Sequence, residues 1–196
     1  MTNDEGMKET RSSFVIPHSS FRVTGAFTLV ELLIVLVIIF ILGGLVLATS
    51  GYVQKKGKRS RAEAEIAAMA AALENYKADN GVYPREGVTD NLDVNTTTLS
   101  NYEAPSLKLY EYLSGDSNHD RAAESNSYFP FKPNQLNPTD QTKTVTSLRD
   151  PFGNPYAYST MKASDSTKNG FNPTFDLWSV ADGAPGTDQT KWIKNW

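Results

Sequence analysis

The feature that most constrains this chain is a long apolar run near its amino terminus. From Leu32 the sequence reads LLIVLVIIFILGGLVLA without a charge, and the preceding FTLVE extends the apolar run to about 22 residues. As a helix this run would be about 33 Å long, enough to cross a hydrocarbon core of about 30 Å. A core helix of a soluble protein would keep a polar face, and this run has none. We therefore predict a transmembrane helix over 27–50.

A cleaved secretory signal is the main alternative for this run. The apolar part of such a signal is about 7–15 residues long and ends at a small-residue cleavage site. Here the small residues Ala48, Thr49, Ser50 and Gly51 follow a run that already exceeds this length. The length therefore favours an anchor that is retained.

Charges around the run bear on its orientation. Lys8, Arg11 and Arg22 precede it among acidic residues, whereas a denser basic cluster follows it, formed by Lys55, Lys56, Lys58, Arg59 and Arg61. The positive-inside rule taken alone would leave the domain after the run in the cytoplasm. The net charge of −3 argues against a general nucleic-acid-binding surface, so no nucleic acid partner is expected.

Glu31 is a carboxylate inside the apolar run. Placing such a group in hydrocarbon costs about 2.5 kcal/mol or more. Two interpretations are open. The side chain reaches headgroup water at the end of the helix, or it pairs with a positive group, such as the free amino terminus of a neighbouring subunit, when helices assemble.

The string GAFTLVELL at 25–33 resembles the type IV prepilin signature shared by pilins and type II secretion pseudopilins. The resemblance implies that a membrane peptidase removes a leader at 1–26 and that the new amino terminus is methylated. It also implies a glutamate at the fifth mature position. Cleavage between Ala26 and Phe27 places Glu31 fifth, whereas cleavage after Gly25 would make Ala26 first and Glu31 sixth.

A second helical pattern follows over 51–80. Apolar residues recur there at spacings of three and four, which is typical of an amphipathic helix: Ala62, Ile66, Met69, Leu73 and Tyr76. Most charged side chains of this stretch, Glu65 among them, are expected on other faces. Asn80 and Gly81 then predict the end of the helix. We expect the apolar stripe to pack on a small sheet.

The region 85–149 is rich in Asn, Thr, Ser and Pro and is interpreted as variable loops with one helical segment at 106–113. Within it, 116–120 places oxygen ligands at alternate positions, as an EF-hand begins. Arg121 stands where an EF-hand needs glycine and Ser127 where it needs glutamate, so we interpret this segment as a polar turn. His119 has no acid partner at a recognisable spacing. With no cysteine in the chain either, no catalytic site is predicted.

From 150 to 196 the strings DPFGNPYAYS and FDLWSVADG predict a turn followed by antiparallel strands. Together with YKADNGVYP at 76–84 and the terminal Asn195-Trp196, they resemble the major, G-type pseudopilins. The resemblance implies an acidic loop that binds Ca²⁺ through the side chains of Asp182 and Asp188 and the backbone carbonyl of Val180. Two carboxylates would also balance one divalent charge.

These patterns together predict an α+β fold of type IV pilin-like form. A long amino-terminal helix, half transmembrane and half amphipathic, packs on a small antiparallel sheet, and 81–196 forms the globular part. The resemblance implies a non-enzymatic filament subunit, the major pseudopilin of type II secretion. The expected partners are copies of itself, sister pseudopilins, prepilin peptidase, an inner-membrane assembly platform and lipid before assembly.

The resemblance also implies a single pass through the bacterial inner membrane, with the globular part in the periplasm. Two other functions remain open from the sequence. One is a type IV pilin for adhesion, motility or DNA uptake, and the other is a membrane-anchored enzyme or binding module.

Overall fold

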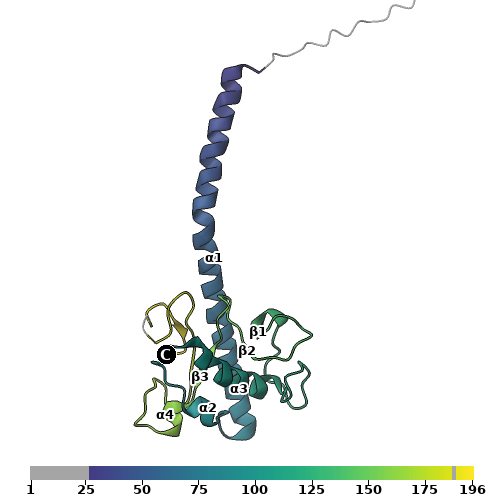
Figure 1. Cartoon of the computed structure of the whole chain (residues 1–196), viewed down its shortest axis with the longest axis vertical. Coiled ribbons are helices and arrows are strands. Elements are labelled where there is room, and N and C mark those ends of the chain that lie inside the picture. The colour runs from purple at the N-terminus through teal and green to yellow at the C-terminus, as the bar shows by residue number, and fades with distance from the viewer. Residues whose placement is uncertain (1–26, 187–188) are drawn as a thin grey trace, which may run out of the picture. The chain divides into compact units, whose positions relative to one another are not determined.

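The computed structural model describes residues 27–186 and 189–196, and Figure 1 labels those of its helices and strands for which there is room. The longest element is helix α1 (Leu29–Asn80). The chain divides into two compact units, of which the first ends at Ala48 and the second runs from Thr49 to Trp196.

The first unit is a single apolar helix. Every large apolar side chain from Phe27 to Leu47 is at least 46% exposed, so no part of the unit buries this surface. Among the described residues, α1 alone is long and apolar enough to cross a membrane. The apolar run thus forms the uninterrupted helix that the sequence predicts, with its whole circumference available to lipid or to other helices.

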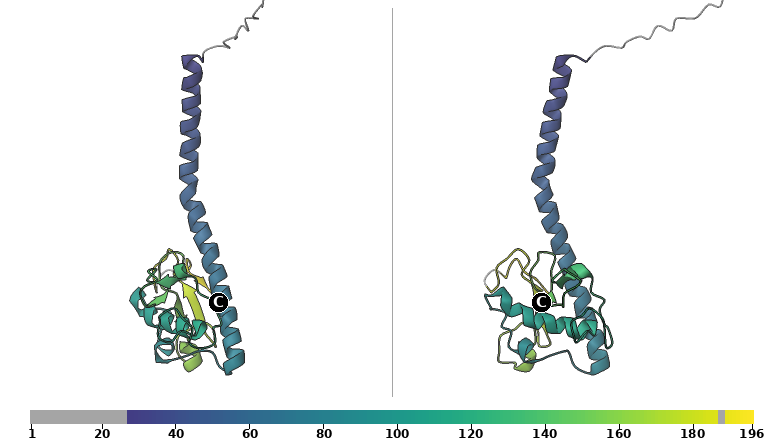
Figure 2. Two further views of the ribbon diagram at one scale, coloured as in Figure 1. Left: turned by 90° about the vertical axis from the view of Figure 1, so that its right-hand side faces the viewer. Right: turned by 45° about the vertical axis from the view of Figure 1, so that its right-hand side comes forward.

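The second unit is built on the carboxyl-terminal half of α1. Ala62, Ile66, Met69 and Leu73 are each no more than 4% exposed, which confirms the amphipathic stripe. Figure 2 shows the strands and shorter helices of this unit gathered on one side of that half of α1. The helix ends as predicted, because Gly81 adopts a left-handed φ of 80° and its N–H bonds back to α1.

Glu65 differs from the expectation for charged residues of this helix. Only 9% of it is exposed, and its carboxylate accepts hydrogen bonds from Arg61 Nε and from the hydroxyl of Tyr156, each at 2.7 Å. Burial and the nearby Glu65 carboxylate both raise the pKa of Tyr156, so this phenol stays protonated as a donor. A buried carboxylate is tolerated here because both of its oxygens are bonded.

The strands are antiparallel, as predicted. Strand β4 (Asp176–Ser179) lies at the centre of a three-stranded sheet, between β3 (Ala157–Ser159) and β5 (Ile193–Lys194). A separate two-stranded sheet pairs β1 (Leu136–Asn137) with β2 (Ser147–Leu148). All four residues of β4 are buried, so the sheet is covered on both faces.

The region 85–149 contains more regular structure than the sequence indicated. It holds α2 (Gly87–Asp90), the 3₁₀ turns η1 (Leu99–Tyr102) and η2 (Pro133–Gln135), and helix α3 (Glu103–Ser114); a further short helix, α4 (Met161–Ser164), follows β3. Helix α3 is longer than the predicted segment and buries Leu109 and Leu113 completely in the core. It ends at Gly115, which has a φ of 75° and lies so close to the backbone carbonyl of Ser125 that a side chain would clash.

Candidate functional site

The first candidate site is the amino-terminal end of α1. Thr28 directly precedes the helix, and its hydroxyl accepts a hydrogen bond of 3.2 Å from the N–H of Glu31. In return, Glu31 Oε2 accepts from the N–H and the hydroxyl of Thr28, each at 2.9 Å. This reciprocal arrangement is a capping box, which satisfies backbone N–H groups that the first turn leaves without partners.

The capping box gives Glu31 a partner within its own chain, which neither sequence interpretation provided. The signal was present in the sequence, since Thr28 and Glu31 have the S/T-x-x-E spacing just before an apolar run. Phe27 is 82% exposed and lies beside this cap. Gly25 and Ala26, the other two residues of the predicted cleavage site, fall outside the described residues.

The second candidate site is the loop that follows β4. Val180 and Ala181 are buried at its base, and Ala181 has a left-handed φ of 53°. A turn then forms in which the N–H of Gly183 donates to the carbonyl of Val180 at 2.8 Å. The Asp182 side chain is 42% exposed and lies 3.3 Å from the Lys55 ammonium, while Asp188 falls outside the described residues.

Asp150, from the predicted DPFGNP turn, contacts the base of this loop. Its carboxylate accepts a hydrogen bond from the hydroxyl of Ser179. The oxygen of that hydroxyl in turn accepts a hydrogen bond of 2.9 Å from the N–H of Ala181. Asn154, from the same turn, donates its amide to the carbonyl of Ala181 at 2.8 Å. Burial raises the pKa of Asp150, whereas the hydrogen bonds that its carboxylate accepts from the Ser179 hydroxyl and from the N–H groups of Phe152 and Asn154 act in the opposite direction. The turn therefore fixes the base of the loop.

The basic cluster of α1 holds the segment after the loop. The guanidinium of Arg59 donates to the carbonyls of Lys191 and Trp192 at 2.7 and 3.1 Å. The indole N–H of Trp192 reaches back to the carbonyl of Ala184 at 3.1 Å. Lys55 and Arg59 thus have partners in the folded unit, and the sequence alone did not indicate them.

The terminal Asn195 and Trp196 are built into the sheet. The side-chain carbonyl of Asn195 accepts the N–H of Leu177 at 2.9 Å, which extends the pairing of β4 beyond β5. Trp196 stacks on Phe171, with ring centroids 4.5 Å apart and planes inclined by 10°. Asn195 thus bonds the sheet, and Trp196 packs on the segment that precedes β4.

The described part of the loop offers hard oxygen donors. It contributes one exposed carboxylate, that of Asp182, and the carbonyls of Val180, Ala181 and Ala184. Within the described residues, each of these carbonyls accepts one hydrogen bond, which leaves a second lone pair. Such donors fit the ligand preference of calcium.

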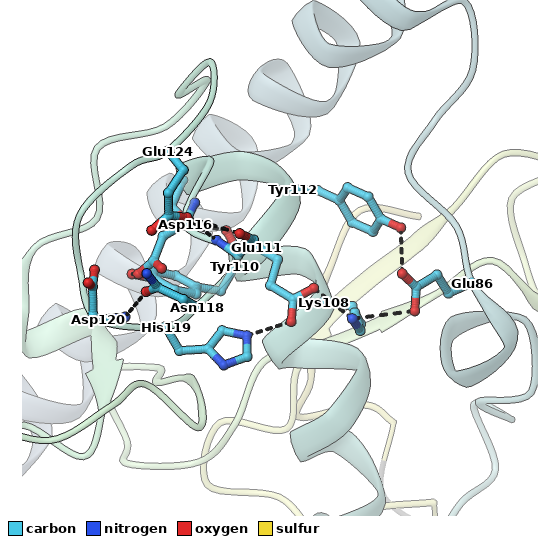
Figure 3. Close-up of polar contacts among 12 residues, drawn as sticks. Glu86, Lys108, Tyr110, Glu111, Tyr112, Asp116, Asn118, His119, Asp120 and Glu124 are labelled. Atoms are coloured by element: carbon cyan, nitrogen blue, oxygen red, sulfur yellow. Dashed lines mark hydrogen bonds and ion pairs between the residues drawn. The ribbon is translucent and has the colours of Figure 1, made fainter.

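His119 does have an acid partner, contrary to the expectation from its spacing. Its Nε2 contacts Oε1 of Glu111, which lies eight residues earlier on α3. Glu111 also bonds Lys108, whose ammonium lies 3.5 Å from Glu86, and Figure 3 shows this chain of contacts. The network ties α3 to the residue that precedes α2, so its evident role is structural.

Comparison with known proteins gives two matches. The chain is 31% identical over 177 residues to type II secretion system core protein G of Pseudomonas aeruginosa, covering 89% of this chain and 96% of that protein. It is 38% identical over 66 residues to the protein of the same name in Pectobacterium carotovorum, covering 34% of this chain and 42% of that protein. No protein-family model matches the chain, and no solved structure does.

The contacts of Arg59 generate a stability prediction. Arg59→Met keeps the apolar stem but removes the two hydrogen bonds to backbone carbonyls, so we expect the unfolding free energy to fall by about 1 kcal/mol. Thermal unfolding of the full chain in detergent measures this as a lower melting temperature. The control is Lys56→Met, an exposed neighbour, which should change little. Equal melting temperatures for the two variants would contradict the anchoring of the terminal segment by Arg59.

Proposed function

This chain belongs to the family of type II secretion system core protein G, and from that premise we propose how its two sites serve a filament subunit. The protein is a structural subunit, the major pseudopilin, of a type II secretion pseudopilus. The observation that carries this conclusion is the extent of the match to the Pseudomonas aeruginosa protein. A match over 89% of the chain has to include both the apolar helix and most of the second unit.

The apolar half of α1 serves first as a membrane anchor and then as the filament core. Its exposed apolar surface is stable only against lipid or against similar helices, so the same surface suits both states. Before assembly the surrounding medium is lipid. After assembly it is the helices of copies of this chain and of sister pseudopilins, gathered by an inner-membrane platform.

Prepilin peptidase removes the leader by cutting between Ala26 and Phe27, and Phe27 becomes the methylated amino terminus. This choice makes Glu31 the fifth mature residue, and the capping box holds its carboxylate at the same end of the helix as the new amino group. A carboxylate placed there is suited to pair with the amino terminus of an adjacent subunit in a low-dielectric helix bundle. Cleavage after Gly25 is the alternative.

The second unit lies in the periplasm, and the chain crosses the inner membrane once. The basic cluster after the apolar run opposes this orientation under the positive-inside rule. In the folded protein, however, Lys55 pairs with Asp182, and Arg59 bonds the terminal segment. These contacts give Lys55 and Arg59 a structural role in the folded unit, and this role is independent of the side of the membrane on which the unit lies.

Calcium binds the loop after β4 through Asp182, Asp188 and the carbonyl of Val180. The support is the donor set of the described part of the loop and its rigid base on Asp150 and Ser179. Lys55 balances the charge of Asp182 when no cation is present. The ion would link the two ends of the loop beside β5. It would therefore stabilise the second unit of each subunit in the filament.

The function is tested by secretion in the native bacterium with the chromosomal copy deleted. We expect the deletion to abolish export of the type II substrates and the wild-type chain to restore it. Glu31→Leu should accumulate in the membrane yet fail to restore export, because it inserts but lacks the charge used in assembly. Glu103→Leu, which changes an exposed acid on α3, is the matched control and should restore export. Unimpaired export in the deletion strain would contradict the secretion role and would favour the alternative function, that of a type IV pilin.

The calcium site is tested by tryptophan fluorescence of the full chain in detergent. All three tryptophans lie between 178 and 196, and Trp192 donates to the loop itself. We expect chelation of calcium to change the emission of the wild-type chain and to leave that of the Asp182→Ala, Asp188→Ala variant unchanged, because the ligands are gone. Asp165→Ala, at an exposed turn, should respond like the wild type. A wild-type chain indifferent to chelation would rule out this site.

A further inference from the structure

Three carboxylates converge in the segment between α3 and β1. One oxygen from each of Asp116, Asp120 and Glu124 lies within 4.8 Å of the other two. Figure 3 shows these side chains together beside the carboxyl-terminal end of α3. The group is separate from the loop after β4 and has no part in the function proposed above.

Asp116 is the buried member of this group. Its Oδ2 accepts hydrogen bonds from the hydroxyl of Tyr110 at 2.6 Å and from the N–H of Arg121 at 2.7 Å. Its Oδ1 is buried and has no hydrogen-bond partner among the residues that the structure describes, and the residue as a whole is only 1% exposed. A buried carboxylate oxygen without a partner is costly, and a cation bound to this oxygen would remove that cost.

The two exposed members are arranged in the same way. Oδ1 of Asp120 accepts the N–H of Ala122 at 2.9 Å, and Oε2 of Glu124 accepts the N–H and the hydroxyl of Ser117 at 2.7 and 3.0 Å. Their other oxygens accept no hydrogen bond within the described chain. Each of the three carboxylates is thus oriented through one oxygen and keeps the other free.

The described part of the chain places no basic side chain in an ion pair with this group. Arg121 lies between two of them in sequence, yet its guanidinium bonds the carbonyls of Pro138, Asp140 and Lys143. His119 is occupied by Glu111. Three negative charges at this separation repel one another unless a cation lies among them.

We propose that a calcium ion binds between Asp116, Asp120 and Glu124. Calcium takes six to eight oxygen ligands in flexible geometry, so three carboxylate oxygens completed by water suit it. The ion can enter from solvent, because Asp120 and Glu124 are exposed. It would satisfy the free oxygen of Asp116 and fasten the segment 116–124 to the end of α3.

This site is not an EF-hand. Arg121 occupies the position that an EF-hand reserves for glycine, and it adopts a φ of 77° there. The third acid, Glu124, stands at the ninth position of that template, but Ser127 stands at the twelfth, where an EF-hand needs its bidentate glutamate. The interpretation of this segment as a polar turn rested on Arg121 and Ser127, and the folded segment brings Glu124 together with Asp116 and Asp120.

The test measures calcium bound to the full chain in detergent by equilibrium dialysis. The background carries Asp182→Ala and Asp188→Ala, so the loop after β4 contributes nothing. We expect this background to bind about one calcium ion per chain, and the further changes Asp120→Asn and Glu124→Gln to weaken binding at least about tenfold. Both residues are exposed, so circular dichroism should show an unchanged fold.

The matched control is Asp140→Asn, which changes an exposed acid in a neighbouring turn and should leave calcium binding at the background value. Two results would overturn the site: a background chain that binds no calcium, or equal affinity with and without the changes at Asp120 and Glu124. Neither result depends on secretion, so the calcium site and the pseudopilin function are tested independently.

Discussion

An apolar helix with no polar face cannot remain in water, and the rest of this structure depends on that constraint. From Phe27 to Leu47 every large apolar side chain is exposed, so this half of α1 has to lie in lipid or among similar helices. Both parts belong to one continuous helix. Its amino-terminal half is the apolar anchor, and its carboxyl-terminal half supplies the buried stripe of the second unit. The capping box at Thr28 and Glu31 begins that helix and holds the Glu31 carboxylate at its apolar end.

The second half of α1 also positions the loop after β4. Arg59 holds the terminal segment, and Lys55 contacts Asp182, while Asp150 and Ser179 fix the base of the loop. The loop is thus fixed by side chains distant in sequence. A cation bound there would act on the junction of helix, sheet and terminus together.

Patterns of local origin were predictable from the sequence. They include the apolar run, the stripe at Ile66 and Met69, the stop at Gly81, the antiparallel strands and the family. Contacts between distant segments were not. Glu65 was expected in solvent because a charged residue is assigned there by default, and its partner Tyr156 lies 91 residues further along the chain. Helix α3 was underestimated because polar loops surround its short apolar pattern, and its burial depends on strands that follow it.

The central claim is that the apolar helix stays in the mature protein and that Phe27 is the first residue of the mature chain. Intact-mass spectrometry of the chain purified from membranes that contain active prepilin peptidase tests this claim directly. The account predicts a mass that corresponds to residues 27–196 with one added methyl group, and fragmentation that places this group on the amino terminus of Phe27. A chain that keeps Met1 in those membranes, or one that has lost the apolar helix, would contradict it.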